Sequence, residues 1–208
     1  MRRIKNTFIP SVTHDVDGVS RSYDLYSRLL KDRIIMLTRP IDSQEASNVV
    51  MQLLILESES KNKPISIYIN SPGGDVYAFL SIIDTMQCLK CEIITVGFGL
   101  VASAAAVILA CGTRGSRFAL PNTRIMIHQP HGNTSGGQVT DIEIQTKEFL
   151  FLKNNLTEMM AKRSVLTPAK IKDLMERDKY CSVDEALKIG LIDKVIFGDF
   201  DDKSKIMR

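Results

Sequence analysis

Length, composition and charge are those of an ordinary soluble globular protein. The 208 residues are 44% hydrophobic and 25% charged, enough for one domain with a sizeable core. The net charge is +3 with acids and bases interspersed, so no basic stripe favours a nucleic-acid partner. The longest apolar run, 96–111, is interrupted by Ser103 and is too short to span a bilayer, so no membrane partner is expected.

The chain alternates between predicted strands and helices, which indicates an α/β domain. The polar stretch 13–22 is expected to be a mobile loop or arm. Strands are expected at 34–38, 65–70, 93–99 and 124–129 and within LIDKVI near the end. Helices are expected at 23–31, 43–59, 75–89 and 141–163, the last with a capping box of Thr140 and Glu143, and shorter ones after Thr167-Pro168 and Ser182.

The four cysteines give little support for a metal or redox site. Cys88 and Cys91 form a CLKC pair, but no second CxxC pair and no matching histidines follow. We therefore expect reduced, largely buried thiols, no metal and a cytoplasmic location. The basic start, MRRIKNTFIPSV, lacks the continuous apolar segment of a signal peptide, which agrees with that location.

One serine, Ser103, stands inside the nearly apolar stretch GLVASAAAVILACG. We expect it about one turn into the helix that follows strand 93–99. A helix N-terminus offers free backbone N–H groups and a positive dipole end, which help an attacking serine and a developing oxyanion. Ser103 is therefore a candidate nucleophile. The alternative is a face of small residues that lets the helix pack closely.

A serine nucleophile needs a base, and the chain has three histidines, His14, His128 and His131. His14 falls in the polar arm, and His131 falls in the glycine-rich connection 131–138. His128, in MIHQP, is the only one carried by a rigid element, at the end of a strand that Pro130 terminates. A half-buried structural histidine is the alternative.

The segment SPGG, residues 71–74, lies at a predicted strand-to-helix junction, where consecutive glycines let a ligand approach the backbone. The Gly74 N–H is a candidate oxyanion donor, and a plain tight turn is the alternative. No GxGxxG dinucleotide fingerprint occurs. Ser103 also lacks the GxSxG sequence of an ordinary α/β-hydrolase.

Taken together, these blocks resemble the ClpP peptidase family, the proteolytic subunits of the Clp protease. The resemblance covers about residues 7–197. SPGG lies inside the match INSPGGDVYAFLSIIDTMQ and MIHQP inside the match GLVASAAAVILACGTRGSRFALPNTRIMIHQP, and further matches are QVTDIEI and SVDEALKIGLID. It implies a crotonase-like superhelix of ββα units with a long protruding handle helix at about 141–163. It also implies an N-terminal arm or axial loop over 1–22, a single peptidase domain over 23–197 and a flexible tail over 198–208.

Carried onto the matching positions, the resemblance implies a serine endopeptidase. Ser103 would be the nucleophile, His128 the general base and Asp178, in MERDKY, the acid that orients the imidazole. The other implied roles are an oxyanion hole from Gly74 and Ala104, substrate binding by Gly132, Asn133, Gly136 and Gly137, ring–ring contacts by Gln138, Glu176 and Arg177, and an unfoldase-docking cleft containing Tyr68 and Phe118.

The family assembles as two stacked heptameric rings around an enclosed chamber, which implies a homo- or hetero-oligomer here. Its partners are hexameric AAA+ unfoldases such as ClpX, ClpA or ClpC, which deliver unfolded polypeptide substrates. No GxxxxGK[ST] sequence occurs in this chain, so only the partner would use ATP, and no cofactor is expected.

The chain departs from the family pattern in two places. Ala104 and Ala105 replace the usual Met-Gly after the serine, and Ser66 and Cys88 stand where the docking cleft often has aromatic residues. These departures suggest a divergent isoform and leave two other functions open. One is a weakly active or inactive structural ring subunit that assembles with an active paralogue. The other is an acyl-CoA-processing enzyme that shares the crotonase fold.

Overall fold

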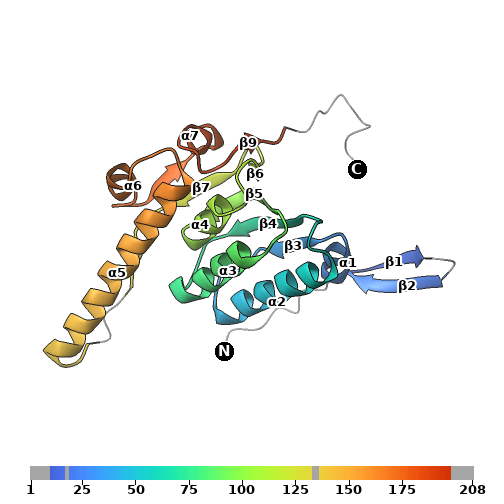
Figure 1. Cartoon of the computed structure of the whole chain (residues 1–208), viewed down its shortest axis with the longest axis horizontal. Helices are drawn as coiled ribbons and strands as arrows, with labels where there is room; N and C mark the ends of the chain where they lie inside the picture. Colours follow the sequence, from blue (N-terminus) through green and yellow to red (C-terminus); the bar gives the residue numbers. More distant parts are fainter. Residues whose placement is uncertain (1–9, 17–18, 133–135, 198–208) are drawn as a thin grey trace.

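The computed structural model describes residues 10–16, 19–132 and 136–197, and a mostly parallel sheet organises them (Figure 1). Five strands lie in the order β3-β4-β5-β6-β9, with every neighbouring pair parallel. Their bounds are Ile34–Leu37 for β3, Ile65–Ser71 for β4, Ile93–Ala102 for β5, Arg117–Ala119 for β6 and Lys194–Val195 for β9. Two further strands, β7 (Arg124–Ile127) and the antiparallel β8 (Lys179–Cys181), extend the sheet beside the end of β5.

Two long helices, α2 (Ser43–Glu59) and α3 (Val76–Cys88), lie side by side along one face of the sheet (Figure 1). Each starts at an aspartate cap: Asp42 accepts from the Glu45 N–H at 2.7 Å, and Asp75 accepts from the Ala78 N–H at 2.9 Å. The side chains of β4 alternate between buried and half-buried, as expected when one face is covered and the other is not.

The short helix α4 (Ala104–Ala110) is buried at every residue. Its run of alanines removes side-chain bulk, so the helix can lie close to the strands and to α3. This all-round burial explains why GLVASAAAVILACG is apolar without being a membrane span. Among the described residues, no helix combines the length and apolar character needed to cross a bilayer.

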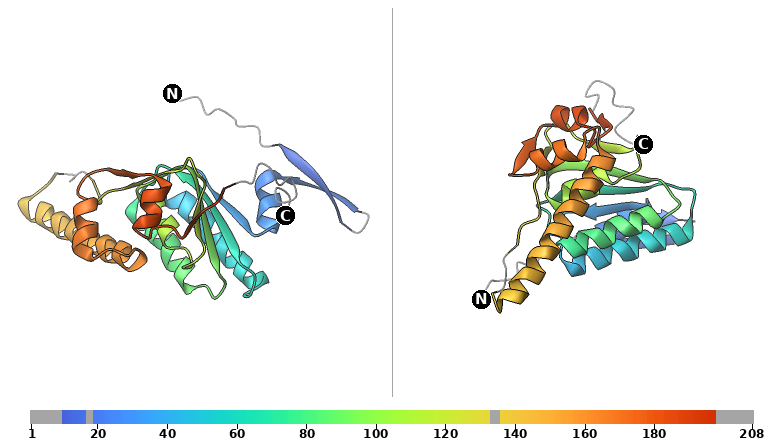
Figure 2. Two further views of the ribbon diagram at one scale, coloured as in Figure 1. Left: turned by 90° about the horizontal axis from the view of Figure 1, so that it is seen from above. Right: turned by 60° about the vertical axis from the view of Figure 1, so that its left-hand side comes forward.

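The long helix α5 (Val139–Arg163) projects from the body of the molecule (Figures 1 and 2). Its base is held by buried Leu152, Leu156 and Met160, whereas Val139 and Phe151 are exposed. The predicted handle is therefore present, but the capping box predicted from Thr140 and Glu143 is wrong. The Gln138 N–H donates instead to Asp141 Oδ2 at 3.2 Å, because the helix begins two residues earlier than the polar pattern indicates.

Two predicted helix starts near the C-terminus are confirmed. The helix α6 (Pro168–Leu174) begins after Thr167, whose hydroxyl accepts from the Lys170 N–H at 3.4 Å. The helix α7 (Val183–Lys188) begins after Ser182, which forms the expected capping box with Glu185.

The stretch 13–22 is expected to be a mobile loop or arm, and the loop alternative is wrong, because its described residues lie in strands. Strands β1 (Ser11–Val16) and β2 (Val19–Asp24) pair antiparallel and lead into helix α1 (Leu25–Lys31). The sequence does not reveal this hairpin, because the polar stretch 13–22 shows no regular alternation of apolar and polar residues. The hairpin and the free end of α5 lie at opposite ends of the molecule (Figure 1).

Candidate active site

Ser103 occupies a sharp turn between a strand and a helix. The strand β5 continues past the predicted end to Ala102, and α4 starts at Ala104, so the expectation that Ser103 lies one turn into the helix is wrong. Its backbone has φ 56° and ψ −125°, a strained conformation for a residue with a side chain. The Ser103 N–H donates to Met126 O at 2.8 Å, which ties the turn to β7.

This turn has the strand–elbow–helix form of a hydrolase nucleophile without the glycines of GxSxG. The flanking positions hold Val101 and Ala105, both fully buried. A small or compact side chain is tolerated at each, so the glycines are dispensable here. The sequence pattern alone therefore missed the elbow.

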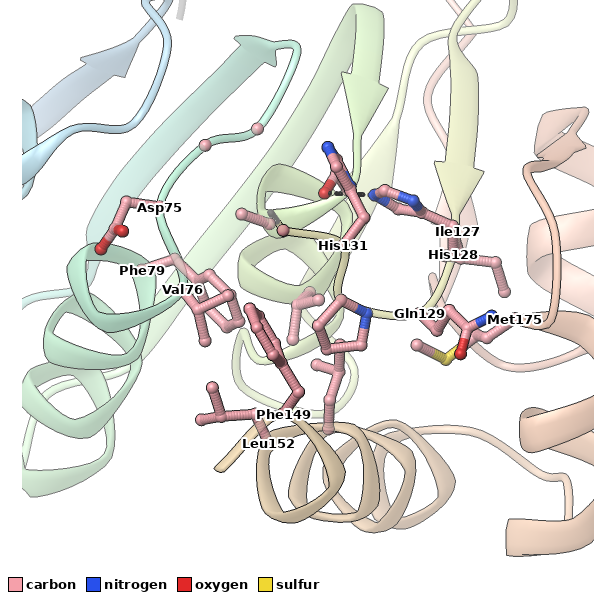
Figure 3. Close-up of a pocket in the computed structure, with 18 of the residues that line it drawn as sticks. Asp75, Val76, Phe79, Ile127, His128, Gln129, His131, Phe149, Leu152 and Met175 are labelled. Carbon is pink, nitrogen blue, oxygen red and sulfur yellow. Dashed lines mark hydrogen bonds between the residues drawn. The ribbon is translucent and has the colours of Figure 1, made fainter. Parts of the chain in front are cut away.

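His128 lies directly beside Ser103 because their strands are paired. Ala102 is opposite Met126 in the β5–β7 ladder, and the two functional residues follow within two positions of that pair. His128 Nε2 lies 2.7 Å from Ser103 Oγ, a hydrogen bond drawn as a dashed line in Figure 3. Burial lowers the pKa of His128 most, a charge on His131 lowers it further, and Asp178 raises it.

Asp178 is the least tightly held of the three predicted residues. It immediately precedes β8, whose first residue, Lys179, pairs with Ile127. Asp178 Oδ1 lies 3.5 Å from His128 Nδ1, which is longer than an ordinary hydrogen bond, and the side chain is 61% exposed. The structure thus brings Ser103, His128 and Asp178 together, with a close serine–histidine pair and a looser carboxylate.

Gln129 fastens the segment that carries Asp178 to the end of β7. Its backbone N–H donates to Met175 O at 2.7 Å, and its side-chain amide donates to Glu176 O at 3.0 Å. Lys153 of α5 adds an ion pair with Glu176 at 3.3 Å. The base of the handle helix is therefore linked to the residues just before Asp178.

The SPGG segment packs against the serine turn from the other side. Ile41 donates its N–H to Gly73 O at 2.9 Å and accepts the Asp75 N–H at 2.8 Å, so this bridge leaves the intervening Gly74 N–H unused. Gly73 has φ +91°, and a Cβ there would lie 2.7 Å from Ser103 Cβ. The chain approaches the turn this closely only because residue 73 is glycine.

A cleft of about 1150 Å³ runs from Ser103 and His128 to the base of α5. In Figure 3, His128 and His131 lie toward one end, and Phe149 and Leu152 of α5 lie toward the other. The cleft therefore joins a nucleophile–base pair to an apolar surface, which suits attack on a substrate that also carries an apolar group.

The described residues among the predicted substrate-binding set, Gly132, Gly136 and Gly137, lie in the chain between this cleft and α5. Gly132 lies against the Phe149 ring, where a Cβ would come within 2.6 Å of Cζ. Gly136 and Gly137 have positive φ and lead into Gln138 at the start of α5, and none of these described residues is in a strand. Asn133 lies outside the described residues.

The remaining predicted residues fall into two groups. Arg177 lines the cleft beside Glu176. Tyr68 and Phe118 lie in one row across the sheet, each opposite Val96, with the Tyr68 ring 6.5 Å from that of Phe98. They do not line the cleft, so any role they have is separate from that of Ser103.

Sequence reasoning set aside one histidine that the structure brings to the site. The sequence places His131 in a glycine-rich connection, yet its ring centroid lies 5.0 Å from that of His128. The available signal was the spacing in HQPH, because a proline turn after the strand can fold the second imidazole back onto the first. Within 10–16, 19–132 and 136–197, no group of three or more His, Cys, Asp or Glu residues could hold a metal ion.

The architecture and the site together define an α/β hydrolytic protein of crotonase-like fold with a serine–histidine pair at a strand–helix turn. The chain matches the family model described as Clp protease over residues 17–199. It therefore belongs to the Clp protease family. Membership makes it a proteolytic subunit of the serine peptidase class and implies an oligomeric assembly that works with an unfoldase.

Proposed function

We propose that this chain is an active serine endopeptidase subunit whose nucleophile is Ser103. The observation that carries the proposal is the 2.7 Å contact between Ser103 Oγ and His128 Nε2 at the strained strand–helix turn. A hydroxyl in that contact can lose its proton to the imidazole as it attacks a carbonyl. Family membership supports a peptide bond as the target.

The proposed reaction follows the serine protease scheme. Ser103 Oγ attacks the scissile carbonyl carbon while His128 Nε2 takes the hydroxyl proton, and His128 later returns a proton to the leaving amine. The developing oxyanion accepts hydrogen bonds from the N–H groups of Gly74 and Ala104. Ala104 N is one of the first N–H groups of α4, which have no acceptor within the helix. Asp178 orients the imidazole and stabilises its charged form.

The substrate is proposed to be an unfolded polypeptide bound as an extended strand. The glycine-rich connection, including Gly132, Asn133, Gly136 and Gly137, would pair with its backbone, a mode that needs exposed main-chain groups and little side-chain bulk. The apolar part of the cleft, with Val107, Phe149 and Leu152, would take a side chain next to the scissile bond. No cofactor takes part in this scheme.

The proposed assembly is two stacked heptameric rings, homomeric or mixed. The handle supports this because Val139, Ile144 and Phe151 are 73%, 64% and 62% exposed on α5, more apolar surface than an isolated subunit tolerates well. Gln138, Glu176 and Arg177 would contribute to the ring–ring contact. A hexameric AAA+ unfoldase such as ClpX, ClpA or ClpC, docked on a cleft with Tyr68 and Phe118, would supply ATP hydrolysis in the cytoplasm.

A weakly active ring subunit is the second candidate, and Asp178 is the observation that favours it. Its carboxylate is largely exposed and lies 3.5 Å from the imidazole, so it orients His128 less firmly than a buried, hydrogen-bonded acid would. Such a subunit would gain full activity only beside a paralogue or an unfoldase.

The test is hydrolysis of a short fluorogenic peptide by the purified protein, with Ser103→Ala as the matched inactive form and particle mass measured by light scattering. Activity of a fourteen-subunit particle that the substitution abolishes supports the peptidase. A well-formed particle without activity, alone and with an added unfoldase, refutes it and favours the structural subunit.

A further inference from the structure

A second imidazole, that of His131, lies against the proposed general base, and the reaction scheme above gives it no role. The two ring centroids are 5.0 Å apart and the ring planes are tilted by 44°. His131 follows the Pro130 turn and lines the same cleft as Ser103 and His128. In Figure 3 the two labelled imidazoles lie side by side next to the dashed hydrogen bond.

The two rings differ in their contact with water. The His128 side chain is 12% exposed, whereas His131 is an exposed residue at the edge of the cleft. Water can therefore solvate a positive charge on His131, whereas a positive charge on His128 is largely shielded from water. Two protonated imidazoles at this separation repel each other, and the less solvated one is the more easily deprived of its proton.

The surroundings of His128 contain other charged groups. Those that line the cleft come from the segment before β8, from the start of α3 and from α5; they are Glu176, Arg177, Asp178, Asp75 and Glu148. The helix α4, which packs beneath the site, carries no ionisable side chain. Among the described groups, His131 and Asp178 are the ones whose charges act on the pKa of His128, and they act in opposite directions.

We propose that His131 is a positioning residue for the reaction, which opposes protonation of His128 and so extends the proposed activity to mildly acidic solution. Asp178 stabilises the imidazolium that forms during the reaction, whereas His131 prevents that charge from forming before the substrate binds. The inference rests on the proposed function, because it matters only if His128 is the base.

The test uses His131→Gln, which removes the ionisable group, and His131→Lys, which keeps a permanent positive charge. The measured quantity is the rate at which diisopropyl fluorophosphate labels Ser103 across a pH series. In that step the Ser103 Oγ–P bond forms, the P–F bond breaks, fluoride leaves and His128 takes the hydroxyl proton. His14→Gln, on the N-terminal hairpin, is the matched control for loss of an imidazole elsewhere.

The two variants are expected to move the rate in opposite directions. A full charge about 5 Å away in a largely aqueous setting changes the protonation equilibrium of His128 by about fourfold. The two variants bracket the parent protein, so labelling at about pH 6 is expected to be roughly twofold slower in His131→Gln and roughly twofold faster in His131→Lys. His14→Gln should follow the parent protein. Identical pH dependence in all four proteins overturns the inference.

A histidine NMR titration on ¹³C-labelled samples of the same proteins separates this inference from the proposed function. If His128 titrates at higher pH in His131→Gln but Ser103 is never labelled, the electrostatic coupling stands and the proposed function fails. If labelling occurs but the His128 titration is the same in every variant, the proposed function stands and this inference is overturned.

Discussion

Replacing Gly73 with alanine tests how closely the SPGG segment must approach the serine turn. A Cβ at residue 73 would lie 2.7 Å from Ala102 O, 2.7 Å from Ser103 Cβ and 2.9 Å from Ala104 N. Two of these atoms belong to backbone, which cannot rotate away. Either the SPGG segment or the serine turn must therefore move by about half an ångström. A displacement of that size is as large as the positional error that catalytic groups can tolerate.

The chain offers a matched control for this substitution. Gly115 has the same φ of +91°, but a Cβ there meets nothing within 4 Å. Both Gly→Ala changes carry the strain of a side chain at positive φ, about 1–2 kcal/mol in the free energy of unfolding. Only Gly73→Ala adds the clash, so the difference between the two variants isolates the approach to Ser103.

The expected result is a loss of peptidase activity specific to Gly73→Ala. Displacing the Gly74 and Ala104 N–H groups from the proposed oxyanion position should lower kcat by about 10²–10³-fold. Gly115→Ala should retain near-parental kcat although it carries the same positive-φ strain. Peptide hydrolysis and urea unfolding measured on both variants check this. Equal kcat values in the two variants would refute the argument that this approach builds the site.

Three further predictions follow from the same structure. Asp178→Asn should lower kcat by about 100-fold, less than the roughly 10⁴-fold loss typical of a buried triad acid, because this carboxylate is 61% exposed. A loss of kcat as large as that of Ser103→Ala would contradict this prediction. Peptide hydrolysis should decline as pH falls through the pKa of His128, because only the neutral imidazole accepts a proton, and burial places that pKa below the ordinary histidine value. A kcat/KM profile that already declines above the ordinary histidine range would disprove this prediction. Arg117→Met should lower the free energy of unfolding, measured in urea, by about 3–5 kcal/mol, because buried Arg117 donates two side-chain hydrogen bonds of 2.9 and 2.6 Å to Asp193. A loss below about 1 kcal/mol would show that the pair is dispensable.

Much of the fold was predictable because its elements bury apolar faces with regular periods. The helix Ser43–Glu59 has the predicted bounds, and β4 shows the expected burial. The strands β6 and β8 were missed because three residues are too few to display a period. Their position depends on partners far away in the sequence, Thr95–Gly97 for β6 and Ile125–Ile127 for β8.

The candidate site was predictable in its residues but not in its geometry. Position after a strand made Ser103 and His128 candidates, and the family resemblance favoured them over the structural alternatives and added Asp178. The positive φ of Ser103 could not be inferred, because the two glycines of GxSxG, which would indicate the turn, are replaced by Val101 and Ala105. The position of the His131 ring beside that of His128 could not be predicted either, because it depends on the path of the chain after Pro130 and not on a local conformational preference.

The proposed catalytic residues directly flank three neighbouring strands: Ser103 follows β5, His128 follows β7 and Asp178 precedes β8. The strand β8 pairs with β7 through only three residues. A slip of one residue between β8 and β7 would turn Asp178 to the opposite face while β5 and β7 kept Ser103 beside His128. Most of the apolar core would survive such a slip. Thermal stability is therefore a poor measure of the fraction of competent molecules in a preparation, and active-site titration is the better measure of its quality.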